Sequence, residues 1–387
     1  MDLSFSDQER DFADEASEWL ATSLEALGLP DRFDSLDDEI EWGVCWQARL
    51  AEARWVGVHW PEAYGGRSAT PVQVALYHMA YAASGAPQPV NRVGINLAGP
   101  TLLAHGTEDQ KQRWLPSILD ASQLWCQLFS EPDAGSDLAS LRTRAEPVDD
   151  DGSGRGPGWL VSGQKVWTSY ARQARWGICL VRTYADAPKH RGISYLVVDM
   201  TQPGITISPL RQITGEAEFN EVFLDEVYVP ADQLVGELGQ GWAVANTTLA
   251  HERGTNFPLK EQVVHEGYLD QLWRRAADDA RLDEAALSDD LAQAFVELRL
   301  LRLHNWRTLS RLGRGLEPGA ESSWVKLAWT DMTQHLSATA LDVVGPGAPL
   351  WGPWERQWLW SKAASIAGGT SEVQRTIIGE RILGLPR

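Results

Sequence analysis

Two glycines near the C-terminus precede a stretch in which apolar residues have helical spacing. Gly368 and Gly369 are followed by Thr370, and the helical pattern begins there. Positions without a side chain let a backbone approach another group closely, and the N-terminus of a helix attracts anions. The alternative is an ordinary turn with a cap, because Ser371 and Gln374 have the spacing of a capping box. The residues alone leave both interpretations open.

A carboxylate stands in line with apolar residues further upstream, in "VANTTLAHERG". Val244, Thr248 and Glu252 are four residues apart, and Leu249 lies three residues before the acid. On a helix these positions share one face, so the acid projects from the apolar side. Burial destabilises a carboxylate, which raises its pKa and makes it a stronger base. The alternative is a structural ion pair between Glu252 and a neighbouring arginine.

The composition excludes several classes of protein. The 387 residues suffice for two or three cooperating units around a large core. The 34 basic and 53 acidic residues give a net charge of −19, which argues against a nucleic-acid surface. No apolar run is long enough to span a membrane. The motifs GxGxxG after a strand, GxxxxGKS/T, HExxH and GxSxG are absent, which disfavours a nicotinamide dehydrogenase, an NTPase, a zincin and a lipase.

The N-terminal segment and the cysteines predict a cytoplasmic protein. The first residues predict a surface helix with Ser6 and Glu9 as a capping box, and they resemble neither a signal peptide nor a transit peptide. Cys45, Cys126 and Cys179 are isolated, with no CxxC and no metal-ligand spacing. Such cysteines suit a reducing compartment, and we expect no metal site.

Helical, strand-like and again helical patterns follow one another along the chain. They predict an N-terminal α-helical domain over 1–122, a middle domain of antiparallel strands over 123–237 and a C-terminal α-helical domain over 238–387. The strand signals are runs rich in Val, Ile, Phe, Tyr and Trp between turn residues. The clearest of these runs are 158–169, 176–184, 192–200 and 219–230, and long amphipathic helices are predicted over 290–312 and 322–344.

Four motifs in this order resemble the acyl-CoA dehydrogenase family over essentially the whole chain. They are "SEPDAGSD" (Ser130–Asp137), "GQKVWTS" (Gly163–Ser169), "GQGW…LAHERG" and "IAGGTSEVQRTIIGERILGLP". The resemblance implies an α+β multidomain fold with a C-terminal domain of the four-helix type. It also implies FAD bound between the β-domain and a helical domain, with the Cα–Cβ bond of an acyl-CoA thioester against the flavin.

The resemblance also implies which residues form the site. Ser169 is expected near the flavin N5, and Thr370 near the phosphate or ribitol region of the cofactor. From composition alone, "EPDAGSD" is a surface turn and Trp167 is a core anchor. The implied cofactor contacts are Phe129, Ser130, Gly135, Ser136, Trp167, Thr168, Ser169, Gly369, Thr370 and Glu372, and the implied substrate contacts are Ser136, Leu249, Arg253 and Gly368.

The position of the catalytic base departs from the common pattern. Many family members carry a catalytic Glu immediately before the Gly-Thr pair, where this chain has Gly368. A second location known in the family corresponds to Glu252. The resemblance therefore implies that Glu252 takes the α-proton while the β-hydride goes to FAD N5, and that electrons pass to an electron-transfer flavoprotein or a similar acceptor.

Two segments that usually contact the FAD of a neighbouring subunit are also altered. Arg274 and Arg275 are present, but the Phe-Gly of an Arg-x-x-Phe-Gly segment does not follow, and "ATALDVVGPGAPLW" replaces a Gly-Gly-x-Gly segment. Either a homo-oligomer with divergent contacts or a heteromer with a second acyl-CoA dehydrogenase-like chain is expected. A non-catalytic or half-site subunit and an acyl-CoA oxidase are the alternative functions, and the acyl chain is open.

Overall fold

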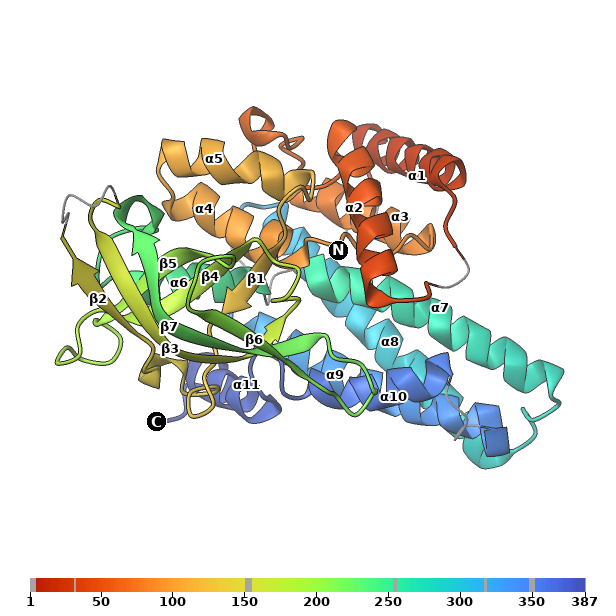
Figure 1. Ribbon diagram of the computed structural model, residues 1–387. Coiled ribbons are helices and arrows are strands. Elements are labelled where there is room, and N and C mark those ends of the chain that lie inside the picture. The colour runs from red at the N-terminus through yellow and green to blue at the C-terminus, as the bar shows by residue number, and fades with distance from the viewer. Residues whose placement is uncertain are drawn as a thin grey trace. The chain divides into compact units, whose positions relative to one another are not determined.

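The computed structural model describes residues 5–30, 33–149, 155–252, 256–316, 319–347 and 352–386 (Figure 1). Contacts within the chain separate two compact units. The sheet unit comprises Pro30–Ser68 and Pro87–Glu252, and the helical unit comprises Met1–Leu29, Ala69–Ala86 and Arg253–Arg387. Helices and strands therefore occur in the combination that the sequence predicted.

The sheet unit is built on seven strands in the order β1-β4-β2-β3-β7-β6, with β5 also paired to β4. Most pairs are antiparallel, as expected, but β1 runs parallel to β4, and β2 meets β4 in parallel through one residue pair. The strands are β1 (Trp125–Leu128), β2 (Arg144–Val148), β3 (Gly158–Ser169), β4 (Trp176–Arg182), β5 (Ile193–Asp199), β6 (Ile205–Leu210) and β7 (Phe219–Pro230).

The long strands β3 and β7 pair antiparallel near the centre of this sheet, and both have the predicted bounds. Their pairing is interrupted between Lys165 and Thr168, so that the end of β3 is kinked. The strands β2 and β6 were not predicted. Each contains a proline, Pro147 or Pro209, which weakens the strand signal.

Helices of the sheet unit pack on its strands and on one another. The helix α6 packs on β5 and on α4, and α4 packs on α5. The core of the sheet includes Val161, Val181, Leu196, Val198 and Val227, all fully buried. The helices are α2 (Leu36–Glu52), η1 (Glu62–Tyr64), η2 (Gly94–Ala98), α4 (Gly99–His105), α5 (Glu108–Leu119), η3 (Leu138–Ser140), η4 (Ala231–Gln233) and α6 (Gly241–Glu252).

The helical unit is a bundle in which α7, α8, α9 and α10 lie side by side (Figure 1). Leu272, Leu291, Ala294 and Leu298 are buried in its core. None of the helices that the structure describes is long and apolar enough to cross a membrane. The helices are α1 (Asp7–Leu27), α3 (Pro71–Ala83), α7 (Asn256–Asp278), α8 (Ala285–Leu312), α9 (Glu321–Val344), η5 (Gly345–Gly347), α10 (Pro353–Ala364), α11 (Ser371–Ile377) and η6 (Ile378–Ile382).

Candidate active site

The first loop of the site, residues 129–143, follows β1 in the sheet unit. A tight turn closes it, because Glu131 and Ala134 exchange backbone hydrogen bonds of 3.1 Å in both directions. Gly135 and Ser136 are exposed beyond this turn, as expected for "EPDAGSD". The hydroxyls of Ser130 and Ser136 make no hydrogen bond within the part of the chain that the structure describes. The loop therefore presents unused polar groups at the surface.

The second loop is the kinked end of β3. Trp167 has a φ of +61°, a left-handed conformation that is unfavourable for a residue with a side chain. Its side chain is 62% exposed, and its ring meets Phe219 edge-on at 6.0 Å. The composition-based interpretation of Trp167 as a core anchor is therefore wrong. Strained residues of this kind cluster at functional sites, where a surrounding structure maintains them.

The two residues after Trp167 differ in their surroundings. Thr168 is fully buried, and its carbonyl oxygen accepts a hydrogen bond of 3.0 Å from Asn220 Nδ2. Ser169 is half-buried, and its hydroxyl has no hydrogen-bond partner in the described ranges. Thr168 and Ser169 are both predicted cofactor contacts, but only Ser169 has an accessible hydroxyl.

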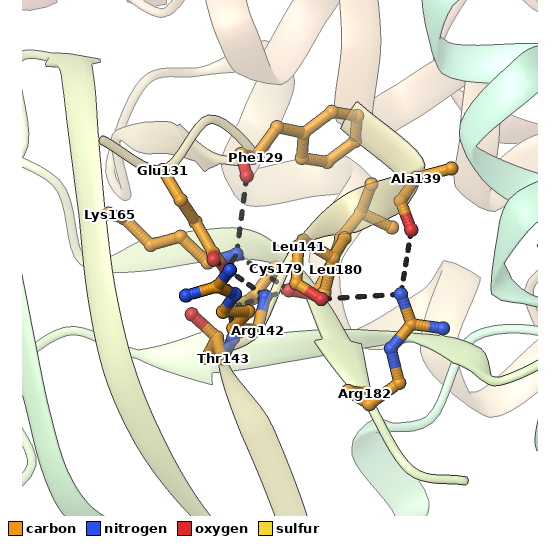
Figure 2. A network of polar contacts seen from close by, with 10 residues as sticks. All are labelled: Phe129, Glu131, Ala139, Leu141, Arg142, Thr143, Lys165, Cys179, Leu180 and Arg182. Carbon is orange, nitrogen blue, oxygen red and sulfur yellow. Dashed lines mark hydrogen bonds and ion pairs between the residues drawn. The ribbon is translucent and has the colours of Figure 1, made fainter. Parts of the chain in front are cut away.

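The structure brings the two loops together. The N–H of Val166 donates to the carbonyl of Ser130 at 2.9 Å. Beneath this bond the buried side chain of Lys165 pairs with Glu131, which joins the strand that carries the second loop to the beginning of the first (Figure 2). The loops therefore form one structural element, although about thirty residues separate them in the sequence.

The helix α6 presents its predicted face to the protein interior. Val244 and Thr248 are buried, which confirms the expected orientation, whereas Leu249 is only half-buried. The backbone of Glu252 ends this helix, but its side chain lies outside the described residues, as does the whole of Arg253. At Thr248, one helical turn before Glu252, α6 is therefore packed into the interior of the sheet unit.

A buried group of hydroxyls connects α6 to the first loop. The Thr248 hydroxyl oxygen lies 2.8 Å from that of Thr101 in α4 and 3.2 Å from that of Tyr195 in β5. Burial raises the pKa of Tyr195, so the phenol stays protonated. The Tyr195 ring meets the Phe129 ring edge-on at 5.9 Å. These contacts were not predicted from the sequence, because they join residues that are distant along the chain.

Histidines also gather around α6. His105 Nε2 lies 2.8 Å from the Thr247 hydroxyl oxygen. His59 is exposed as a residue, yet burial of its imidazole and, as the smaller cause, the positive charge of protonated His251 together lower its pKa to about 4. The pKa of His251 is lowered by burial as well. His59 and His251 are therefore neutral at neutral pH.

The glycine pair belongs to the helical unit and adopts a conformation reserved for glycine. Gly368 and Gly369 have φ values of +65° and +94°. Thr370, not Ser371, is the N-cap of α11, since its hydroxyl accepts from the N–H of Val373 at 3.2 Å. The predicted capping box of Ser371 and Gln374 is therefore wrong.

The side chain of Gln374 instead helps to fix the glycine turn. It donates to the carbonyls of Gly368 at 3.0 Å and Gly369 at 3.2 Å. Lys326 in α9 donates to the Gly369 carbonyl at 3.0 Å. Glu372 is exposed, and its pKa is lowered by its own backbone N–H and by the Thr370 hydroxyl. The structure thus explains both glycines by backbone geometry.

Family models match the chain in three consecutive parts. The model of the acyl-CoA dehydrogenase N-terminal domain matches residues 6–122, that of the middle domain matches 126–227, and that of the C-terminal domain matches 239–383. No group of three or more metal-ligating side chains comes together in the described part of the chain.

Two curated relatives from Mycobacterium tuberculosis differ in length. Acyl-CoA dehydrogenase IpdE1 is 40% identical, and the match covers 95% of this chain and 96% of IpdE1. Acyl-CoA dehydrogenase FadE34 is 43% identical, but the match covers 88% of this chain and only 46% of FadE34. FadE34 thus contains about one further chain length of sequence.

Solved structures share the whole fold. The chain superimposes on a chain of the ChsE4-ChsE5 complex from M. tuberculosis with a TM-score of 0.84, at 30% identity and over 100% of both chains. The Tcur3481-Tcur3483 steroid ACAD gives a TM-score of 0.85 at 26% identity, over 100% of both chains. A glutaryl-CoA dehydrogenase from Mycobacterium smegmatis in complex with FADH2 has the same fold, with a TM-score of 0.77 at 21% identity over 98% of this chain and 95% of that one.

Proposed function

Because the chain belongs to the acyl-CoA dehydrogenase family, we propose that it oxidises the Cα–Cβ bond of an acyl-CoA thioester. The observation that carries this proposal is the pair of joined loops with an exposed Trp167 and unused hydroxyls. The protein's own tasks in the reaction are to hold the cofactor and the thioester and to accept the α-proton. FAD, when bound, supplies the acceptor for the β-hydride.

The residues of the two loops fit FAD, the cofactor of this family. A flat, largely apolar ring system can cover the Trp167 side chain, which the protein leaves 62% exposed. The hydroxyls of Ser130 and Ser169 can bond to its polar edge, and Phe129 and Thr168 are further proposed contacts. In the same proposal Gly135 and Ser136 contact the cofactor, as do Gly369, Thr370 and Glu372 of the helical unit.

Glu252 is the proposed base. Val244 and Thr248, which precede it at intervals of four residues, face the interior, so a carboxylate on this line leaves water when substrate binds. Desolvation then raises its pKa toward that required for abstracting a thioester α-proton. His251 and His59 are neutral and add no positive charge that would oppose this shift. Leu249, Arg253, Ser136 and Gly368 are the proposed substrate contacts.

A ring-bearing acyl group is the proposed substrate class. The support is the likeness over the full length to a structure described as a steroid ACAD. A straight-chain acyl group is the alternative that the test must separate.

A second acyl-CoA dehydrogenase-like chain is the proposed partner. The ChsE4-ChsE5 and Tcur3481-Tcur3483 structures each bring together two different chains, and FadE34 is about twice as long as its match to this chain. The altered segments after Arg274 and in "ATALDVVGPGAPLW" give the same indication. A homo-oligomer, a half-site subunit without its own activity and an acyl-CoA oxidase are the alternatives.

The environment of the protein is part of the same proposal. Cys45, Cys126 and Cys179 are free thiols, and burial raises the pKa of Cys179 to about 11, so it stays unreactive. These cysteines support the predicted cytoplasmic location. An electron-transfer flavoprotein or a similar protein is the proposed electron acceptor.

The function is tested by mixing the purified holoprotein anaerobically with acyl-CoA thioesters that carry straight, branched or steroid-derived chains. We expect a ring-bearing thioester to bleach the oxidised flavin, and flavin content to rise when a family member encoded nearby is co-expressed. The proposed reaction would be contradicted if dithionite reduces the bound flavin but none of these thioesters does. Rapid reoxidation by O₂ rather than by an electron-transfer flavoprotein would identify an oxidase.

A further inference from the structure

Lys165 is a fully buried lysine whose ammonium group has three acceptors. Its Nζ lies 2.9 Å from Glu131 Oε1, 3.2 Å from the Phe129 carbonyl oxygen and 2.8 Å from the Leu180 carbonyl oxygen. Figure 2 shows these oxygens converging on the amine from the first loop and from β4. An ammonium has three protons, so each is used. The position of each acceptor is therefore tied to the amine.

Glu131 extends these contacts to the far end of the first loop. Its two carboxylate oxygens accept from the backbone N–H groups of Arg142 at 2.6 Å and Thr143 at 2.9 Å. Burial would raise the pKa of this carboxyl, but the charge of Lys165 and the hydrogen bonds outweigh burial, so the pKa is lowered. The carboxylate is charged at neutral pH and closes residues 131–143 into a loop.

Arg182 in β4 supports the same loop from a second side. Its guanidinium donates to the carbonyls of Ala139 at 2.7 Å and Leu141 at 3.2 Å (Figure 2). These carbonyls lie just before the N–H groups that Glu131 binds. The loop is thus held at both ends by charged side chains, while its tip at Gly135 and Ser136 stays exposed.

The contact between Lys165 and Phe129 fixes the direction of the next peptide group. In a trans peptide the carbonyl and the following N–H point in opposite directions. Because the Phe129 carbonyl faces Lys165, the Ser130 N–H points away from it. This N–H has no hydrogen bond to the described residues, whereas the Ser130 carbonyl already accepts from Val166. The N–H and hydroxyl of Ser130 are therefore the groups left for a ligand.

We propose that Lys165 is the positioning residue of the cofactor site: its buried ammonium holds the first loop against β3 and turns the Ser130 N–H outward before FAD binds. This inference rests on the proposed FAD site. A well-packed apolar pair can be as stable as a buried ion pair. We therefore assign to Lys165 the role of fixing the geometry of the two loops, in addition to any contribution to stability.

The test compares Lys165→Met with the double variant Glu131→Gln/Lys165→Met, which removes both charges of the buried ion pair and leaves neither unpaired. Affinity for FAD is measured by titrating apoprotein, and amide hydrogen exchange is measured in peptides that cover residues 129–143. We expect both variants to bind FAD at least tenfold more weakly and to exchange the Arg142 and Thr143 amides at least tenfold faster. Lys189→Met, which removes an exposed ion pair to Asp137 at the tip of the same loop, should change neither quantity.

A matched control separates positioning from general destabilisation. Val227→Ala removes a fully buried side chain from β7 in the same core. We expect it to lower stability while FAD affinity and loop protection stay within about threefold of the parent.

Parent-like affinity and loop protection in the double variant would overturn the proposal, and so would an equal loss of affinity in Val227→Ala. If the parent itself binds no FAD, the proposed function fails, and the exchange rates alone decide whether Lys165 orders the loop.

Discussion

Trp167→Ala removes the side chain that we propose to lie against the flavin. The residue is 62% exposed and holds a left-handed backbone conformation, so the apoprotein gains little from it. A tryptophan side chain has up to about 250 Å² of surface to bury, of which about 150 Å² is left accessible here. At about 25 cal/mol per Å², complete coverage of that area would contribute about 4 kcal/mol to binding.

A flat ring covers only one face of the indole, so the flavin would bury at most about half of this accessible area. We therefore expect Trp167→Ala to weaken FAD binding by about 2 kcal/mol, which is roughly 30-fold in the dissociation constant. The apoprotein loses the edge-on contact with Phe219, which is worth about 0.5–1.5 kcal/mol beyond the buried area. The substitution thus acts on affinity and, separately, on stability.

The assay is equilibrium titration of the apoprotein with FAD, followed by flavin fluorescence, together with urea unfolding of each apoprotein. Trp273→Ala is the control, because Trp273 is 41% exposed in α7 and has no proposed role in the site. Its FAD affinity should equal that of the parent. Unchanged FAD affinity in Trp167→Ala would refute the placement of the flavin at the second loop.

Further predictions concern pH, the hydroxyl group and the glycine turn. His59 has a lowered pKa and therefore binds its proton more weakly in the folded state than in the unfolded state. Its neutral form contributes to the free energy of unfolding above about pH 6.5, and this contribution is lost as the pH falls toward 4. His59→Asn should therefore lose less stability than the parent between pH 7 and pH 5 in urea unfolding; an equal loss would contradict the lowered pKa. Tyr195→Phe should cost about 1 kcal/mol in the same assay, since one hydrogen bond to Thr248 is lost while the ring stays in place; a loss above about 3 kcal/mol would mean that the ring moves. Gly369→Ala should lower the free energy of unfolding by about 1–2 kcal/mol, which is more than Gly28→Ala should cost. Both glycines have positive φ, but only the new Cβ at position 369 would meet a side-chain atom, at 2.7 Å. Equal losses in the two variants would show that this contact relaxes freely.

The residue types along the strands made much of the sheet predictable. β3 and β7 have the predicted bounds because both strands are rich in Val and aromatic residues and lie between clear turn signals. β2, with the sequence "RAEPV", has charged residues and a proline, and its pairing with β3 decides its conformation. The parallel pairing of β1 with β4 depends on the path of the chain between them, which no local pattern encodes.

The two loops of the proposed site were recognisable in the sequence, but the contacts that hold them together were not. Lys165 is buried like Trp159 and Val161, which precede it at even spacing along β3, but its burial was not predicted from the sequence. Its partner Glu131 was not predicted either, because the two residues are 34 positions apart and meet only in the folded chain. The same holds for Thr248 and Tyr195, which come from different elements.

We propose that Glu252 takes the α-proton, and this role is measured by single-turnover reduction of the flavin by a bound acyl-CoA. Glu252→Gln keeps the shape of the side chain and removes the proton acceptor, and Glu237→Gln is the same change at an exposed residue just before α6. General-base catalysis is worth roughly 10²- to 10⁴-fold, so Glu252→Gln should slow flavin bleaching by at least about 100-fold while thioester affinity changes far less. Glu237→Gln should bleach at the parent rate. A Glu252→Gln protein that binds the thioester and reduces its flavin as fast as the parent would show that another residue takes the α-proton.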